Sequence, residues 1–413
     1  MSAPQPPLLR GQPAPGPPPP PPWHRVISDE GFRLFFPLAA IHAALWPFLW
    51  IAVQGYGLIG ATGIAPSVWH MHEMVVGAFG AALIGFLTTA FPEWTDTPPL
   101  KGRALWGLAG LWGVARVIGL VGWDALAPLA GLADLGWIAA LTAYALRISW
   151  QRRTDRLLVF AGWLAAFWIA VAVTRWQMIA GDSCLAGEAV KTTGLIFLGF
   201  LGLALARITP PVTNLVLDPS EETSPYRPHP GRMNLAPGLV ALVIMARAFG
   251  LSDAVTGWLL IAAGAGFIDR IAESFIGPEA LRAEIVALAL TSALSGAGLI
   301  WLGAVGLGAP LPPAGGWHLA LMGGLGVAVL AVQSIAGLFH SGRTLPVSAA
   351  VRLALAALLG ATALRLLPEL GLADPVLAHV AASILWAAGF GIWLWRYWPL
   401  LSDPATLGQH EGC

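Results

Sequence analysis

The chain contains nine histidines but few other ionisable groups, and six of the histidines fall in or beside strongly apolar stretches. The densest group is the sequence WHMHEM at residues 69–74. Neutral imidazole is the commonest metal ligand in proteins, and imidazole with a thioether suits copper. His70 and Met74 have the four-residue spacing that places side chains on one helical face, and His318 and Met322 repeat it. These residue types indicate metal binding.

Each histidine also has a plainer interpretation. Side chains two residues apart face away from each other on a regular helix, so His70 and His72 either serve different sites or lie in an unwound first turn. Any of the helix-end histidines could instead be bonded to a carbonyl or to water, and for His379 we favour that over ligation. His42 is equally well explained as a hydrogen-bonded core residue.

The elements that position these residues are membrane helices. Hydrophobic residues make up 57% of the chain and charged residues only 11%, against about 45–50% and about 25% in soluble domains. The mean hydropathy is +0.71, and the formal net charge is zero. We therefore expect a lipid bilayer as the surrounding medium, and we exclude nucleic acid as a partner because no basic stripe is present.

The expected fold is all-α, a polytopic bundle of about twelve transmembrane helices of about 20 apolar residues each. The predicted spans are 33–54, 70–91, 104–122, 125–147, 157–180, 190–210, 235–251, 254–272, 283–308, 317–340, 346–367 and 376–398.

Three segments are predicted from composition. Residues 1–30 form a Pro-rich tail, expected to be disordered and lacking the apolar core of a signal peptide. Residues 31–400 form the membrane domain, in which the polar loop 211–234 separates two groups of six helices. Residues 401–413 form a C-terminal tail.

Basic residues occur in every second connection, and this alternation sets the expected orientation. By the positive-inside rule, both termini face the cytoplasm. His70, His72, His318 and His379 then lie near the outer surface, where they could converge. His42 lies about 13 Å along its helix from Arg33, near mid-membrane, and His340 lies at the inner end, about 33 Å from His318. His318 and His340 are therefore too far apart to share one ion.

The charged residues within the apolar stretches are scattered along the sequence, and we expect no charged cluster at mid-membrane. Arg207, near the inner end of its span, either pairs with an anionic group such as a haem propionate or serves as a cytoplasmic anchor. The sequence contains no catalytic carboxylate pair, nucleophile elbow or phosphate-binding loop, so no catalytic residue is predicted.

Several blocks resemble the NnrS family. The sequence GFRLFF at 31–36 is similar to its opening GFRPFF block, with Leu34 in place of proline, and WHMHEM matches its WHxHEM block. Further similar stretches are GFLTTAFPEWT at 85–95, PPL at 98–100, ARITP at 206–210 with TN at 213–214, the segment from His318 to HSGR at 340–343, and RY with PL at 396–400. The last third departs from the family in detail, since the block from His318 lacks a threonine and an arginine.

The resemblance implies a multi-pass protein of the bacterial inner (cytoplasmic) membrane that contains haem b and copper. It further implies that the protein binds or responds to nitric oxide, or to another small gas ligand, and protects against nitrosative stress. By motif match, His70, His72, His318 and His340 are the candidate ligands of haem or copper. His42 and His379 match no block, and together with Met74 they are secondary candidate metal ligands. Two other functions remain open. Twelve helices in two groups suit a secondary transporter, and haem would also suit a membrane electron-transfer subunit with a redox partner.

Overall fold

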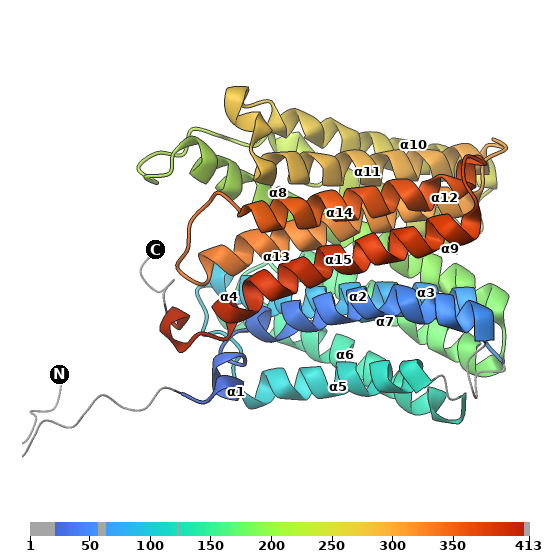
Figure 1. Cartoon of the computed structure of the whole chain (residues 1–413), viewed down its shortest axis with the longest axis horizontal. Helices are drawn as coiled ribbons and strands as arrows, with labels where there is room; N and C mark the ends of the chain where they lie inside the picture. The colour runs from blue at the N-terminus through green and yellow to red at the C-terminus, as the bar shows by residue number, and fades with distance from the viewer. Residues whose placement is uncertain (1–20, 57–62, 122–123, 409–413) are drawn as a thin grey trace, which may run out of the picture.

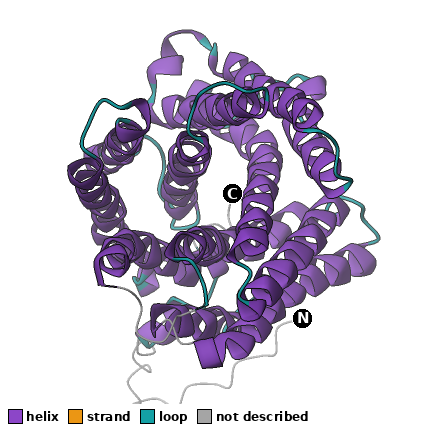
Figure 2. Cartoon of the chain, turned by 90° about the vertical axis from the view of Figure 1, so that its right-hand side faces the viewer, coloured by secondary structure: helices purple, strands orange, loops and turns teal. Residues whose placement is uncertain are grey.

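The computed structural model describes residues 21–56, 63–121 and 124–408, and in these residues the chain is helical with no β-strand. The helices run side by side as one bundle (Figure 1), and Figure 2 shows it end-on. The all-α prediction is therefore confirmed.

The long helices are α2 (Gly31–Tyr56), α5 (Arg103–Val121), α6 (Ala127–Arg152), α7 (Leu158–Ala180), α8 (Ser183–Leu217), α9 (Leu235–Ala248), α10 (Asp253–Asp269), α11 (Ala283–Gly306), α14 (Ala349–Leu366) and α15 (Pro375–Leu401). Two further rods are composite, α3 (Pro66–His72) with η1 (Glu73–Phe79) and α4 (Gly80–Thr95), and α12 (Pro313–Trp317) with η6 (His318–Gly326) and α13 (Val327–Phe339). Short turns are α1 (Trp23–Val26), η2 (Asp124–Leu126), η3 (Pro230–Arg232), η4 (Arg270–Ser274), η5 (Gly277–Leu281), η7 (Pro368–Leu370) and η8 (Pro404–Thr406).

Ten helical segments in the described part of the chain are long and apolar enough to cross a membrane. The two predicted spans outside this set correspond to α5 and α9. With 14 residues, α9 is about 21 Å long, which is shorter than the roughly 30 Å hydrocarbon core of a bilayer. The structure thus supports a multi-pass membrane protein, and the count of twelve stays a prediction.

The polar loop between the two predicted halves is shorter than the sequence suggested. Helix α8 does not stop at residue 210 but continues through Pro210 and Pro211 to Leu217. Prolines are tolerated within membrane helices because neighbouring groups satisfy the freed backbone atoms. The loop then folds back, because the Asn214 side chain both donates to the Tyr226 carbonyl (3.2 Å) and accepts from the Tyr226 N–H (2.7 Å).

Two π-helical segments, η1 and η6, interrupt otherwise regular rods. Such wide turns are rare and are found frequently at functional sites. Both lie against close neighbours. A Cβ added to Gly77 in η1 would come 2.4 Å from His42 Nε2, and one added to Gly324 in η6 would come 2.1 Å from Ser295 Oγ. Glycine at these positions is therefore what allows the wide turns to pack, and the hydrophobic pattern did not predict them.

The first and last described segments meet at one end of the bundle, here called the termini end (Figure 1). Arg33 donates to the carbonyls of Leu401 (3.0 Å), Thr406 (2.8 Å) and His340 (3.4 Å), and to the Thr406 hydroxyl (2.8 Å). Packing begins before residue 31, because Val26 and Ile27 are already buried. Residues 1–20 and 409–413 of the two predicted tails lie outside the described residues.

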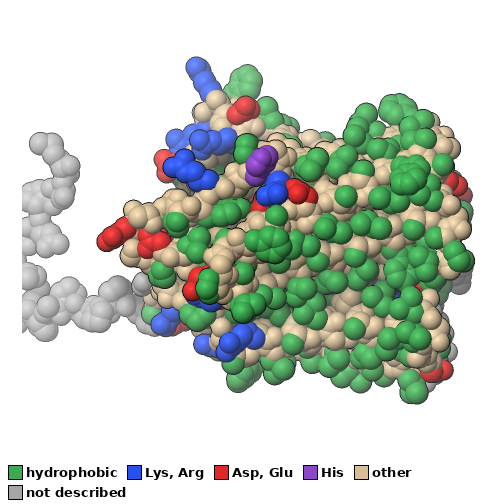
Figure 3. Space-filling view, turned by 90° about the horizontal axis from the view of Figure 1, so that it is seen from above, with side chains coloured by type: hydrophobic (Ala, Val, Ile, Leu, Met, Phe, Trp, Pro, Cys, Tyr) green, Lys and Arg blue, Asp and Glu red, His purple; other side chains and the backbone are tan. Residues whose placement is uncertain are grey.

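The surface matches a bundle surrounded by lipid. Large apolar side chains are exposed along the helices, including Leu132, Trp176 and Val376 at 69–70%. In Figure 3, apolar side chains cover the right and centre of the face, whereas Lys and Arg gather toward the termini end. This distribution agrees with the basic connections noted in the sequence.

Candidate functional site

Three of the predicted histidines gather at the end of the bundle opposite the termini. His70 is in α3, His318 begins η6, and His379 is in α15, so three separate rods supply them. They lie close enough to interact electrostatically with one another and with Arg365 of α14. We call His70, His318 and His379 the histidine group. The predicted convergence of helix-end histidines is thus found for these three.

The ring nitrogens of the histidine group are available for ligation. His318 Nδ1 lies 2.8 Å from the Ala314 carbonyl, which can only accept, so Nδ1 carries the proton and the Nε2 lone pair is free. Among the described residues, buried His70 Nδ1 and buried His379 Nε2 make no hydrogen bond. The His70 ring stacks on Trp50 with the ring centres 4.7 Å apart.

The histidine group is not a preformed site for a single ion. Within the described part of the chain, no three His, Cys, Asp or Glu side chains are arranged so that one metal ion could bind them together. Arg365 places a positive charge near the three imidazoles. Arg365 donates to Glu369 at 2.7 Å.

His72 points to a different part of the bundle. Its Nδ1 lies 3.3 Å from Glu73 Oε1, and its Nε2 lies 3.7 Å from Asp134 Oδ2. The chain is a regular α-helix from Pro66 to His72, so side chains two positions apart face in different directions. The structure therefore agrees with the first interpretation of the His-x-His pair, in which His70 and His72 belong to different sites.

The surroundings of His72 contain a buried group of four charged residues, Glu73, Arg116, Asp134 and Arg175, which we call the ion cluster. Arg116 donates to Glu73 at 2.9 Å and to both Asp134 oxygens at 2.6 and 2.8 Å. Arg175 Nε donates to Asp134 at 3.0 Å. The four side chains come from four rods, and their formal charges balance, as buried charges require.

We expected no charged cluster at mid-membrane, but the structure shows a buried cluster within the helical bundle. Arg116 and Arg175 looked isolated because their shared partner, Asp134, lies 18 and 41 residues away in sequence. Sequence separation hides such pairs, since helices that are distant in the chain pack side by side. One signal was available, because Asp134 is a carboxylate within an apolar span, where a charge is costly without a partner.

His42 completes this region as a satisfied core histidine. Its Nε2 lies 3.1 Å from the Glu73 carbonyl and 3.5 Å from the Glu73 carboxylate. The ring stacks on Trp46 with centres 4.5 Å apart, and Trp112 approaches edge-on. His42 therefore acts with the ion cluster and lies outside the histidine group.

His340 lies at the termini end, as predicted, away from the other candidate ligands. Its Nδ1 is 3.4 Å from Glu93 and 3.7 Å from Glu30, and its ring lies 5.0 Å from that of Phe32. Two carboxylates therefore lie beside this imidazole.

The other two predicted residues have packing roles in the structure. The Arg207 guanidinium lies over the neighbouring rings of Trp94 and Phe160, at 4.9 and 4.8 Å from their centres, and donates to the Arg156 carbonyl. Met74 packs against a cluster that contains Trp46 and Trp69.

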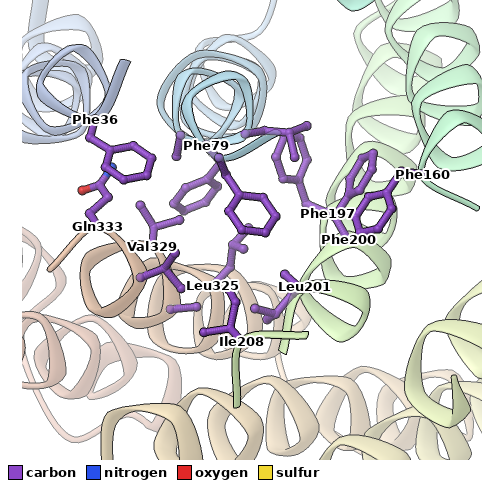
Figure 4. A pocket seen from close by; sticks show the side chains of 16 residues that line it. Phe36, Phe79, Phe160, Phe197, Phe200, Leu201, Ile208, Leu325, Val329 and Gln333 are labelled. Carbon is purple, nitrogen blue, oxygen red and sulfur yellow. The ribbon is translucent and has the colours of Figure 1, made fainter. Parts of the chain in front are cut away.

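A cavity of about 70 Å³ lies within the bundle, bordered by residues of both π segments (Figure 4). Phe79 of η1 and Leu325 of η6 line it, and Gln333 of α13 projects from its wall. The sequence did not predict this cavity, because its lining residues come from five different rods.

These features define a polytopic helical membrane protein with a histidine group at one end and charged residues buried inside. The sequence matches the family model described as NnrS protein over residues 26–405, which is nearly the whole chain. The chain belongs to the NnrS family. No curated protein and no solved structure matches it.

Proposed function

We propose that the protein is a haem- and copper-binding member of the NnrS family that binds nitric oxide and protects against nitrosative stress. The observation that supports this is the histidine group, in which buried nitrogens of His70 and His379 have no hydrogen-bond partner among the described residues and lie near the His318 imidazole. A buried polar atom without a partner is costly, so its retention calls for a ligand. Family membership supplies the nitric oxide connection.

The residues fit a haem in the following way. An imidazole of the histidine group would bind the haem iron, and Arg365 would balance a propionate. The haem would supply a coordination position for a small gas. His318 is held in orientation by its bond to Ala314, which is the usual role of the second nitrogen of a ligating histidine. His72 and His340, in their separate polar surroundings, are the proposed copper ligands.

In this proposal the termini end faces the cytoplasm of a bacterial cell and the histidine group lies near the outer face of the inner membrane. The basic side chains gathered toward the termini end support this orientation.

An optical spectrum and metal analysis of the purified protein test the proposal. We expect a b-type haem spectrum, copper in the same sample, and a spectral change when nitric oxide is added. Absence of both haem and copper from protein produced with an adequate supply of each would refute it. Haem without any response to nitric oxide would favour the electron-transfer alternative.

The ion cluster gives the transporter alternative an observation in its favour, because buried charges are common along ion pathways. The cluster is, however, paired within itself, which equally suits a structural role. Solute uptake by proteoliposomes that contain the native protein, and that protein-free liposomes lack, would establish transport.

A further inference from the structure

The cavity between the two π segments has an unusual lining. Six phenylalanines surround it, Phe36, Phe79, Phe86, Phe160, Phe197 and Phe200. Of the described residues that line it, Gln333 alone is polar. The Gln333 side chain is 1% exposed, and neither its amide nitrogen nor its amide oxygen has a hydrogen-bond partner in the described part of the chain.

An unpaired amide in such a place is not explained by packing. Burying both polar atoms without partners is unfavourable, and an aliphatic side chain of similar size would avoid the penalty. In Figure 4, the Gln333 amide lies beside Phe36 at one edge of the cavity. The retained amide indicates an occupant that offers a weak hydrogen-bonding atom.

The size and lining restrict what that occupant can be. A cavity of about 150 Å³ accepts benzene, and this one, at about 70 Å³, is less than half as large. Water is a poor occupant, because a buried water needs about two to four polar partners and the lining offers one amide. A small apolar molecule with a weak dipole fits this volume and needs no polar partner beyond the one amide.

We propose that this cavity is a binding site for a single small gas molecule of diatomic size, held by the phenylalanine rings and oriented by Gln333. Such gases dissolve readily in the apolar interior of a bilayer, and partly exposed lining residues such as Ala204 and Ile208 connect the cavity with the outside of the bundle. Phe79 and Leu325 place it next to the segments that follow His72 and His318. That the gas is nitric oxide rests on the proposed function.

Xenon tests the site, because it binds apolar cavities of this size and needs no metal. Crystals of metal-free protein under xenon pressure should show xenon between Phe79 and Leu325. Ala204→Leu, which fills the cavity from α8, should abolish that density. Ala189→Leu, also partly exposed on α8 but away from the cavity, should leave it unchanged. Val329→Phe fills the cavity from α13 and replaces Ala204→Leu if that variant does not fold.

Absence of xenon from the native cavity, or a lipid or detergent chain within it, would overturn the proposal, as would xenon that persists in both filling variants. The metal-free test also separates this site from the proposed function. Xenon binding in a protein that never acquires haem or copper would leave the cavity proposal standing and remove nitric oxide as its inferred occupant.

Discussion

Arg116 and Asp134 form a two-bond ion pair inside the bundle, with N–O distances of 2.6 and 2.8 Å and exposures of 5% and 0%. Arg175 binds the same carboxylate from another helix, so one aspartate holds three helices together. An arrangement of this kind is sensitive to the loss of one member, because the remaining charges stay buried.

Asp134→Asn should therefore destabilise the protein by about 3–5 kcal/mol, since it leaves two arginines with a single buried carboxylate, Glu73. Thermal unfolding in detergent measures the change. Glu369→Gln, which weakens the Arg365 pair at the edge of the bundle, is the matched control and should have a smaller effect. Equal stability of the Asp134→Asn and native proteins would show that the ion cluster is not structural.

Single replacements should divide the histidines by site. His70→Ala, His318→Ala and His379→Ala should each lower the haem content of purified protein, because the three lie together. His340→Ala should retain haem, because it lies at the termini end. His229→Ala, in the exposed loop, controls for expression. Loss of haem in the His340 variant, or unchanged haem in all three variants of the histidine group, would contradict this assignment.

Gln333→Leu should raise stability by roughly 1–3 kcal/mol in protein free of gas, because it removes two buried polar atoms without partners. Gln177→Leu, at a partly exposed position of α7, should change stability little. Differential scanning fluorimetry compares the two. If the Gln333 variant were instead less stable, the amide must have a partner in the native protein.

The short helix α9 makes the number of spans testable. In a variant lacking Cys184 and Cys413, Ser252→Cys between α9 and α10 should react with an impermeant maleimide in intact cells if α9 crosses the membrane. Ser220→Cys, in the loop after α8, should react only after permeabilisation. Labelling of Ser252→Cys only after permeabilisation would mean that α9 does not span and that the count of twelve is too high.

The sequence predicted the features that depend on local composition. Long apolar stretches predict membrane helices, and basic connections distinguish their two ends, so the bundle and the separation of His340 from His318 followed directly. The features that depend on contacts between distant helices did not follow. Asp134 stands out in sequence only as a carboxylate within an apolar span, and its pairing with Arg116 and Arg175 is visible only once the helices pack.

The hydrophobic period of the sequence also did not predict the local geometry of two segments, η1 and η6. A hydrophobic pattern predicts where a helix lies but does not distinguish the usual turn from the wider π turn. Gly77 in η1 and Gly324 in η6 lie in close contact with His42 and Ser295, and these contacts exist only in the folded bundle.

The bonds of Arg33 have a consequence for synthesis. Thr406 is 373 residues further along the chain, so the ribosome completes nearly the whole protein before Arg33 can meet it. Until then, an arginine at the start of the first membrane helix has none of its bonds to Leu401 and Thr406. The contacts of Arg33 with Leu401 and Thr406 therefore form only after the last helix has been inserted. A chain truncated before residue 401 therefore keeps a membrane-helix arginine without three of its four hydrogen bonds.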